Sequence, residues 1–249
     1  CANINFERNE FDAYYQKNLQ YIFGDNVSRK LSNIQSIFWR QYNQNYEHPT
    51  DDASLRKILT GGGVNFDEIR DPWGTPFQAK FSTQRWYDII QIVSAGANKT
   101  FGDADDFVAL TQNFQYFMKE GVRLNEAVIN YPKTTGKFVH DIETLREALA
   151  AKDINLDDLK DRWGEPYRIE FGTYGRYLTI YFHSNGADKK YTRDYYDDFT
   201  VWTNYTDYFA ETEAKISQVM TKYLAEKKIF PKDEAEFKQV LKDGGIDFD

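Results

Sequence analysis

The 249-residue chain contains a single cysteine, Cys1, and no long hydrophobic run. One thiol cannot form an intrachain disulfide, and no Cys/His set with zinc-site spacing is present. Without an apolar stretch of about 18 residues, no membrane span is expected. Basic residues are in deficit, since 31 Lys and Arg stand against 39 Asp and Glu for a net charge of −8. This balance argues against nucleic-acid binding, which needs a basic surface, and is compatible with binding a hard cation.

Cys1 has three interpretations that the sequence leaves open. It is an artefact of how a fragment begins, the acylated first residue of a mature bacterial lipoprotein, or an N-terminal nucleophile. The second implies a lipid anchor and an extracytoplasmic location, whether periplasmic, on the cell surface or secreted. The third needs a neighbouring base, and the sequence points to none. Because no catalytic set clusters or recurs, we expect a non-enzymatic protein.

Aromatic residues make up 17% of the chain, enough to build sizeable cores despite 28% charged residues. Some aromatics fall at positions expected to be exposed: Trp86, Tyr174, Tyr195 and Tyr196. Tyr and Trp favour interfaces, so these side chains suggest a binding surface for a protein or glycan partner. An equally open alternative is that they cover the sheet.

An internal repeat is the clearest feature of the sequence. Residues 55–99 align without gaps to residues 145–189, with 17 identities in 45 positions. A third copy begins near the end, where 237–249 matches 55–67. We therefore expect a fragment of a longer repeat protein. Its expected divisions are an N-terminal helical segment (1–28), two complete repeats (29–110 and 111–204) and the start of a third (205–249).

Each repeat is predicted to be α+β, a long helix packed on a small antiparallel sheet with a short extra helix. The long helices are marked by apolar residues at helical spacing, including Phe114, Phe117 and Met118 in the second copy, and should end before Pro49, Pro132 and Pro231. The short helices are expected over 52–60 and 142–150. Period-two alternation predicts strands over 77–81, 87–93, 167–171 and 177–183, with short third strands over 107–110 and 199–202.

An acidic loop lies between the second and third strands of each copy and closes with the same Asp-Asp-Phe sequence. Calcium takes six to eight oxygen ligands from carboxylates, amides and backbone carbonyls. Two adjacent carboxylates repel each other without a cation. A loop that carries glycine, an Asx residue and paired aspartates therefore predicts a calcium site in each copy; the alternative is a solvated turn in which these residues only turn the backbone.

The order of long helix, short helix, Asp-x-Trp-Gly-x-Pro turn, two strands, Ser-x-Gly-Ala-[Asp/Asn] and Asp-Asp-Phe resembles the periplasmic domain of the G-type major pseudopilin of type II secretion systems. The resemblance covers about residues 30–108 and 114–203. It implies a pilin-like fold and one structural calcium ion in each complete copy. The ligands carried over by motif position are Asn98, Asp105 and Asp106 in the first copy and Asp188, Asp197 and Asp198 in the second, with Asp103 and Asp194 as additional candidates.

Two departures from the family shape the expected function. The hydrophobic N-terminal helix of a pseudopilin is missing, and a pilin has one such domain rather than a tandem array. We therefore expect a calcium-binding structural or interaction module of a larger secreted or surface bacterial protein. The alternatives are an aromatic-faced binding module, of the adhesin or protease-inhibitor type and including part of an α2-macroglobulin-like protein, and a secretion-system pseudopilin component. Because Asn98 is neutral where Asp188 is charged, we expect the second site to be the stronger one.

Overall fold

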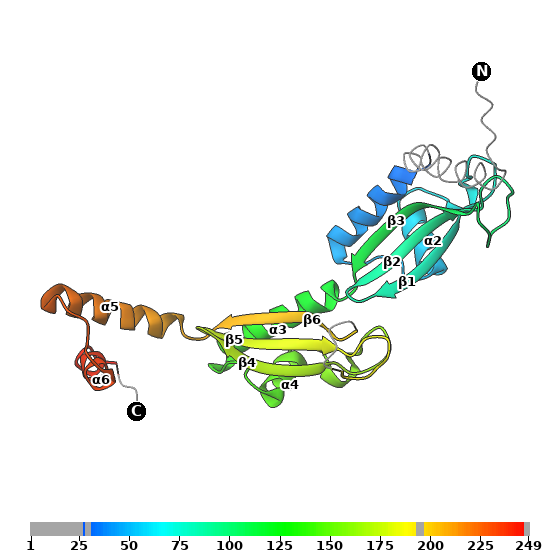
Figure 1. The fold of residues 1–249 in the computed structure, drawn as a ribbon. Helices are drawn as coiled ribbons and strands as arrows, with labels where there is room; N and C mark the ends of the chain where they lie inside the picture. Colours follow the sequence, from blue (N-terminus) through cyan, green and yellow to red (C-terminus); the bar gives the residue numbers. More distant parts are fainter. Residues whose placement is uncertain (1–26, 28–30, 193–196, 247–249) are drawn as a thin grey trace, which may run out of the picture. The chain divides into compact units, whose positions relative to one another are not determined.

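The computed structural model describes residue 27 and residues 31–192 and 197–246 (Figure 1). Four expectations lie outside the described residues: the lipid anchor at Cys1, the helical segment 1–28 except Val27, Asp194 with its neighbours Tyr195 and Tyr196, and the last three residues of the third copy. The chain divides into two compact units, Cys1–Val122 and Arg123–Asp249, which are described separately. None of the described helices is long and apolar enough to cross a membrane.

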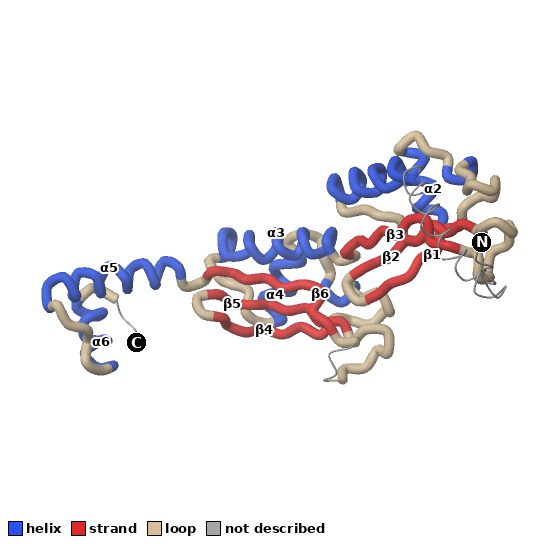
Figure 2. Tube along the Cα trace, turned by 45° about the horizontal axis from the view of Figure 1, so that its top comes forward, coloured by secondary structure: helices blue, strands red, loops and turns tan. Residues whose placement is uncertain are grey.

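The first unit holds a helix over residues 31–45 and a three-stranded antiparallel sheet in the order β1-β2-β3 (Figure 2). Between the helix and the sheet in sequence come the helix α2 (Asp52–Gly61) and the short 3-10 helix η1 (Phe66–Glu68). The strands are β1 (Gln78–Gln84), β2 (Tyr87–Ser94) and β3 (Phe107–Gln115).

The second unit has the same order of elements. It contains α4 (Ile142–Ala150), η2 (Leu156–Asp158) and a sheet of β4 (Arg168–Tyr174), β5 (Tyr177–Ser184) and β6 (Phe199–Asp207). Its long helix, α3 (Met118–Thr135), begins at the end of the first unit. Two further helices follow, α5 (Ala210–Lys227) and α6 (Glu234–Asp243). The protein is therefore α+β, with two small antiparallel sheets.

The two sheets match strand for strand, including their irregularities. The register of β2 with β3 shifts between Ile92 and Val93, and that of β5 with β6 shifts at the equivalent Phe182 and His183. The short helices begin alike, because Asp51 and Asp141 cap them through the backbone amides of Ser54 and Thr144. An acceptor on the residue before a helix satisfies an amide that has no partner within the helix. The sequence repeat is thus a repeat of local structure.

A helical contact also recurs at the start of the expected third copy. A Cβ atom on Gly62 would lie 2.6 Å from Ile37 Cδ1, and one on Gly244 would lie 2.4 Å from Val219 Cγ2. In both places only glycine lets the short helix approach the long one this closely. The α5–α6 pair therefore reproduces the helix contact of the first unit.

Two expectations about helices and strands were wrong. The third strands continue past the predicted 107–110 and 199–202, so Phe114 belongs to β3 and Phe117 precedes α3. Buried Phe107, Ala109 and Phe114 show that the apolar spacing follows a strand face here. Pro132 lies inside α3 rather than after it.

The proline is tolerated because it stands in the last turns of α3. The hydroxyls of Thr134 and Thr135 donate hydrogen bonds to the Asn130 and Tyr131 carbonyls, at 3.4 and 2.7 Å. Gly136, with φ of 71°, ends the helix by donating to the Pro132 carbonyl. These contacts satisfy carbonyl groups of the last helical turn, which lack intrahelical donors.

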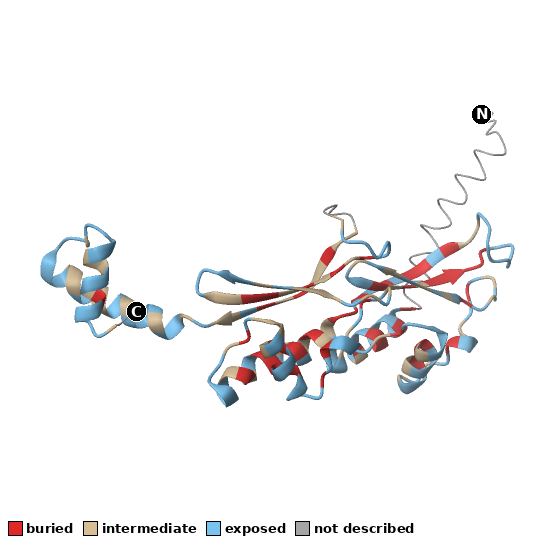
Figure 3. Ribbon diagram, turned by 90° about the horizontal axis from the view of Figure 1, so that it is seen from below, coloured by how far each residue is buried: buried red, intermediate tan, exposed pale blue. Residues whose placement is uncertain are grey.

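The core of the first unit lies between its helices and one face of its sheet (Figure 3). Leu31, Ile34 and Phe38 form the buried stripe of the helix over 31–45, at the spacing of one helix face. The Phe38 ring meets Phe114 of β3 edge to face, with 6.2 Å between centroids. Helix and sheet are thus joined by aromatic packing.

This core contains a buried contact between a histidine and an aspartate. His48 Nε2 lies 2.8 Å from Asp88 Oδ2, both side chains are less than a tenth exposed, and the Thr83 hydroxyl donates to Asp88 Oδ1 at 2.8 Å. The His48 ring stacks on Phe114. In the second copy the equivalents of His48 and Asp88 are Phe138 and Leu178. The same fold is therefore compatible with an apolar pair here.

We predict that Asp88→Leu alone lowers the free energy of unfolding by about 1–3 kcal/mol, because it leaves a buried imidazole without its partner. The double variant His48→Phe/Asp88→Leu should recover most of that loss, since it installs the second copy's pair. Urea denaturation of both variants measures the difference. A double variant as unstable as the single one would contradict this account.

Candidate metal centre

The start of each acidic loop is held by a buried aspartate from the Asp-x-Trp-Gly turn. Asp71, only 4% exposed, accepts hydrogen bonds at Oδ1 from the amides of Trp73 and Thr75, at 3.0 and 2.8 Å. Its other oxygen accepts from the Ser94 hydroxyl at 2.7 Å, and Ser94 Oγ accepts from the Gly96 amide at 3.1 Å. The carboxylate thus joins the turn to the end of β2, where the acidic loop begins.

The second copy has the same network with the same roles. Asp161 accepts from the amides of Trp163 and Glu165 and from the Ser184 hydroxyl, the last at 2.6 Å. Ser184 Oγ accepts from the Gly186 amide at 3.0 Å. Because a buried carboxylate is costly unless its oxygens are hydrogen-bonded, each network fixes where its loop leaves the sheet.

Glycine lets each loop close on itself. Gly96 and Gly186 have φ of 67° and 66°, a region that glycine adopts without strain. A Cβ on Gly96 would lie 2.3 Å from the Asp105 carbonyl oxygen, and one on Gly186 would lie 2.5 Å from that of Asp197. The first residue of each Asp-Asp pair therefore lies directly against the start of its loop.

The structure brings the predicted Asx residue and the first paired aspartate together. Asp105 Oδ2 accepts from the Asn98 amide, and Asp197 Oδ2 accepts from the Asp188 amide, both at 2.9 Å. Asn98 also donates from Nδ2 to Asp103 Oδ2 at 2.7 Å. Hydrogen bonds with Asp105 and with Asn98 lower the pKa of Asp103. Asp103 also accepts from the Asp105 backbone amide at 3.2 Å, so it lies beside both Asn98 and Asp105.

The second aspartate of each pair has one oxygen engaged and one buried without a partner. Asp106 Oδ2 accepts from the Gly102 amide at 2.8 Å, and Asp198 Oδ2 accepts from the Thr192 amide at 2.9 Å. Their Oδ1 atoms are inaccessible and find no hydrogen-bond partner among the described residues. An unsatisfied buried oxygen carries a desolvation penalty, and the same oxygen is left without a partner among the described residues in both loops.

Carboxylate oxygens are the type of ligand that calcium prefers, but these carboxylates do not by themselves surround an ion. In the parts of the chain that the structure describes, no three Asp, Glu, His or Cys side chains gather as metal ligands do. An ion would draw on Asp106 or Asp198, on the neighbouring aspartate, and on backbone oxygens. The second loop offers one more buried oxygen without a described partner, that of Asn185, where the first copy has Ala95.

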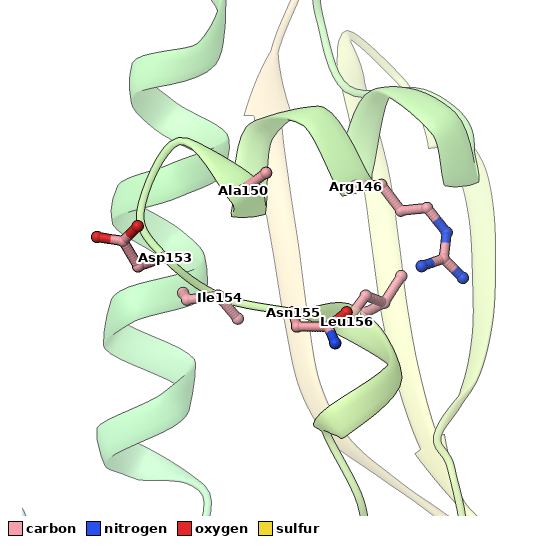
Figure 4. A pocket seen from close by; sticks show the side chains of 6 residues that line it. All are labelled: Arg146, Ala150, Asp153, Ile154, Asn155 and Leu156. Atoms are coloured by element: carbon pink, nitrogen blue, oxygen red, sulfur yellow. The ribbon is translucent and has the colours of Figure 1, made fainter.

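A surface depression of about 400 Å³ lies between α4 and η2 (Figure 4). Figure 4 shows Arg146 and Asp153 on opposite sides of it. The guanidinium of Arg146 is paired with Asp157 at 2.7 Å. No nucleophile or acid–base pair converges there among the described side chains that line it, so the depression supports no catalytic assignment. The lining residues are Arg146, Ala150, Asp153, Ile154, Asn155 and Leu156.

Comparisons with protein-family models, with curated proteins and with solved structures found no match.

We predict that Ser94→Ala lowers the free energy of unfolding by about 1–3 kcal/mol, because it removes a donor from the buried Asp71 carboxylate. Ser82→Ala, on the exposed side of β1, is the matched control and should change it by less than about 0.5 kcal/mol. Urea denaturation checks both. Equal midpoints for the two variants would show that the Asp71 network does not hold the loop.

Proposed function

We propose that the protein is a non-enzymatic, calcium-stabilised interaction module that works outside the cytoplasm and is built from pilin-like repeats. The observation that carries the proposal is the inaccessible, unpartnered Oδ1 of Asp106, repeated at Asp198. A cation beside each oxygen would remove the desolvation penalty and the repulsion within the Asp-Asp pair. The ion would act as a structural cross-link between the two ends of the loop.

The residues proposed to hold calcium divide by copy. In the first loop they are Asp105 and Asp106, with Asn98 and Asp103 beside them; in the second they are Asp188, Asp197 and Asp198. Asp194 belongs to the proposed second set by sequence position alone. Loops of this composition suit the millimolar calcium of extracellular fluids, where modules bind with dissociation constants of about 10⁻⁴–10⁻³ M.

The pilin-like part of the proposal is supported by the order of elements. Each unit contains a long helix, a short capped helix and a three-stranded antiparallel sheet, and the acidic loop joins the second and third strands. The sheet and helices supply a rigid scaffold, and the loop is the segment that calcium would order. Binding would then be coupled to local folding.

We predict that calcium at 100 times its dissociation constant stabilises each binding unit by about 2.7 kcal/mol. A thermal melt in calcium chloride should therefore shift upward by roughly 10–20 °C relative to a melt in EGTA, because about 1 kcal/mol moves the melting temperature of a small domain by roughly 4–8 °C. Asp106→Asn/Asp198→Asn should abolish the shift. Asp158→Asn, an exposed position in η2, is the matched control and should retain it.

An unchanged melting temperature in the unsubstituted protein would refute the calcium proposal. So would a full shift in the Asp106→Asn/Asp198→Asn variant, because it would place the ion elsewhere.

We also predict that the two loops differ in affinity, since Asn98 contributes no charge where Asp188 does. Asn98→Asp should strengthen calcium binding to the first loop, and Asp188→Asn should weaken binding to the second. Calorimetric titration separates the two sites, and both substitutions should move their own site only. Changes in the opposite direction would show that these residues do not face the ion.

A further inference from the structure

The side of the second sheet away from the core carries a group of tyrosines that the first sheet lacks. The register of the three strands aligns their outward-facing residues in four rows, here called rungs, each with one residue from β4, β5 and β6. The rungs are Tyr174–Tyr177–Asp207, Gly172–Thr179–Tyr205, Glu170–Tyr181–Thr203 and Arg168–His183–Thr200. We call Tyr174, Tyr177, Tyr181 and Tyr205 the tyrosine face.

The four rings lie close together. Tyr177 and Tyr205 meet edge to face, with 6.1 Å between centroids, and a hydrogen bond with Tyr181 raises the pKa of Tyr205. Thr179 lies between Tyr177 and Tyr181 along β5 and is only 2% exposed, although it is on the side away from the core. The rings therefore form one continuous surface over the middle of the sheet.

Two of these rings are strongly exposed, and the fold does not require them. Tyr174 is 69% exposed and Tyr205 is 54% exposed. In the first sheet, Gln84, Gln91 and Asn113 take the positions of Tyr174, Tyr181 and Tyr205, and only Tyr87 matches a tyrosine of the second. Since the same scaffold is built with amides there, the three extra rings point to a ligand.

The charges on this side are paired. Arg168 forms an ion pair with Glu170, and Arg176 lies 3.0 Å from Asp207. Arg176 also lies over the Tyr177 ring, at 5.3 Å from its centroid. His183 Nε2 lies 3.4 Å from the carboxylate of Glu170. The face therefore suits an uncharged ligand better than an anion or a cation.

The four rungs carry no aliphatic side chain, and they cover a small area. Three strands about 4.8 Å apart and four alternate residues along each give a face of roughly 10 by 20 Å. A stable protein interface buries about 800 Å² on each partner around an apolar core. A face of this size and polarity fits a flat, hydroxyl-rich ligand of a few rings better than a folded protein.

Gly172 leaves a gap between the rings on the edge strand β4, because it has no side chain. A Cβ placed there would meet one atom within 4 Å, Thr179 Oγ1 at the close distance of 3.1 Å. A tyrosine offers a ring face for the apolar C–H side of a sugar and a hydroxyl for its rim. We propose that the tyrosine face binds a neutral glycan, with sugar rings stacked on Tyr174 and Tyr205 beside the gap at Gly172.

The test uses the first copy as its template. Tyr174→Gln/Tyr181→Gln/Tyr205→Asn installs the first sheet's residues, and Tyr87→Gln, on the first sheet, is the matched control. Native affinity electrophoresis through gels that contain xylan, mixed-linkage β-glucan, galactomannan or dextran measures retardation, with polygalacturonate as an anionic comparison. Circular dichroism and a thermal melt confirm that each variant is folded.

We expect at least one neutral polysaccharide to retard the unsubstituted protein and the Tyr87→Gln control equally. Its dissociation constant should rise about tenfold or more in the triple variant, which corresponds to about 1.4 kcal/mol or more. The proposal is overturned if no neutral polysaccharide retards the protein, if polygalacturonate alone does, or if the triple variant binds as well as the parent. Self-association in sedimentation experiments that the triple variant abolishes would also overturn it, because the face would then be a contact between copies.

Discussion

The buried carboxylate of the Asp-x-Trp-Gly turn is the contact on which each unit's candidate metal centre depends. Asp71 and Asp161 each join two backbone amides of their own turn to a serine hydroxyl 23 residues further along the chain. The serine in turn accepts from the amide of the glycine that starts the acidic loop. These hydrogen bonds fix the position at which each acidic loop leaves the sheet, which is why the two loops can present their aspartates in the same way.

Duplication supplies an internal comparison that a single domain does not offer. The networks at Asp71 and Asp161 agree contact for contact, whereas other positions have diverged on the same scaffold. A buried His48–Asp88 pair in one unit corresponds to Phe138 and Leu178 in the other. Three amide side chains on the outer side of the first sheet correspond to tyrosines on the outer side of the second. The contacts that are the same in both copies stabilise the fold and hold the acidic loop. The residues that differ between the copies give each unit its own surface or core packing.

Much of the fold could be predicted from local chemistry. The short helices expected over 52–60 and 142–150 and the alternation along β1, β2, β4 and β5 placed those elements to within three residues. The end of β3 could not be placed, because Phe114 and Phe117, which lie outside α3, happen to continue its helical spacing. Stopping β6 at Trp202 also left Tyr205 outside the sheet, so the tyrosine face could not be assembled from the sequence. The partners of Asp71 and Asp161 were equally out of reach, since a hydrogen bond over 23 residues leaves no local pattern.

The central claim is that each acidic loop closes around a calcium ion at the second aspartate of its Asp-Asp pair. The most direct test is a crystal structure determined with calcium present, with anomalous differences collected to identify the ion. The account predicts an ion about 2.3–2.6 Å from Asp198 Oδ1, with a weaker counterpart at Asp106. An Asp198 Oδ1 that is hydrogen-bonded to protein or water, with no anomalous peak beside it, would contradict the claim.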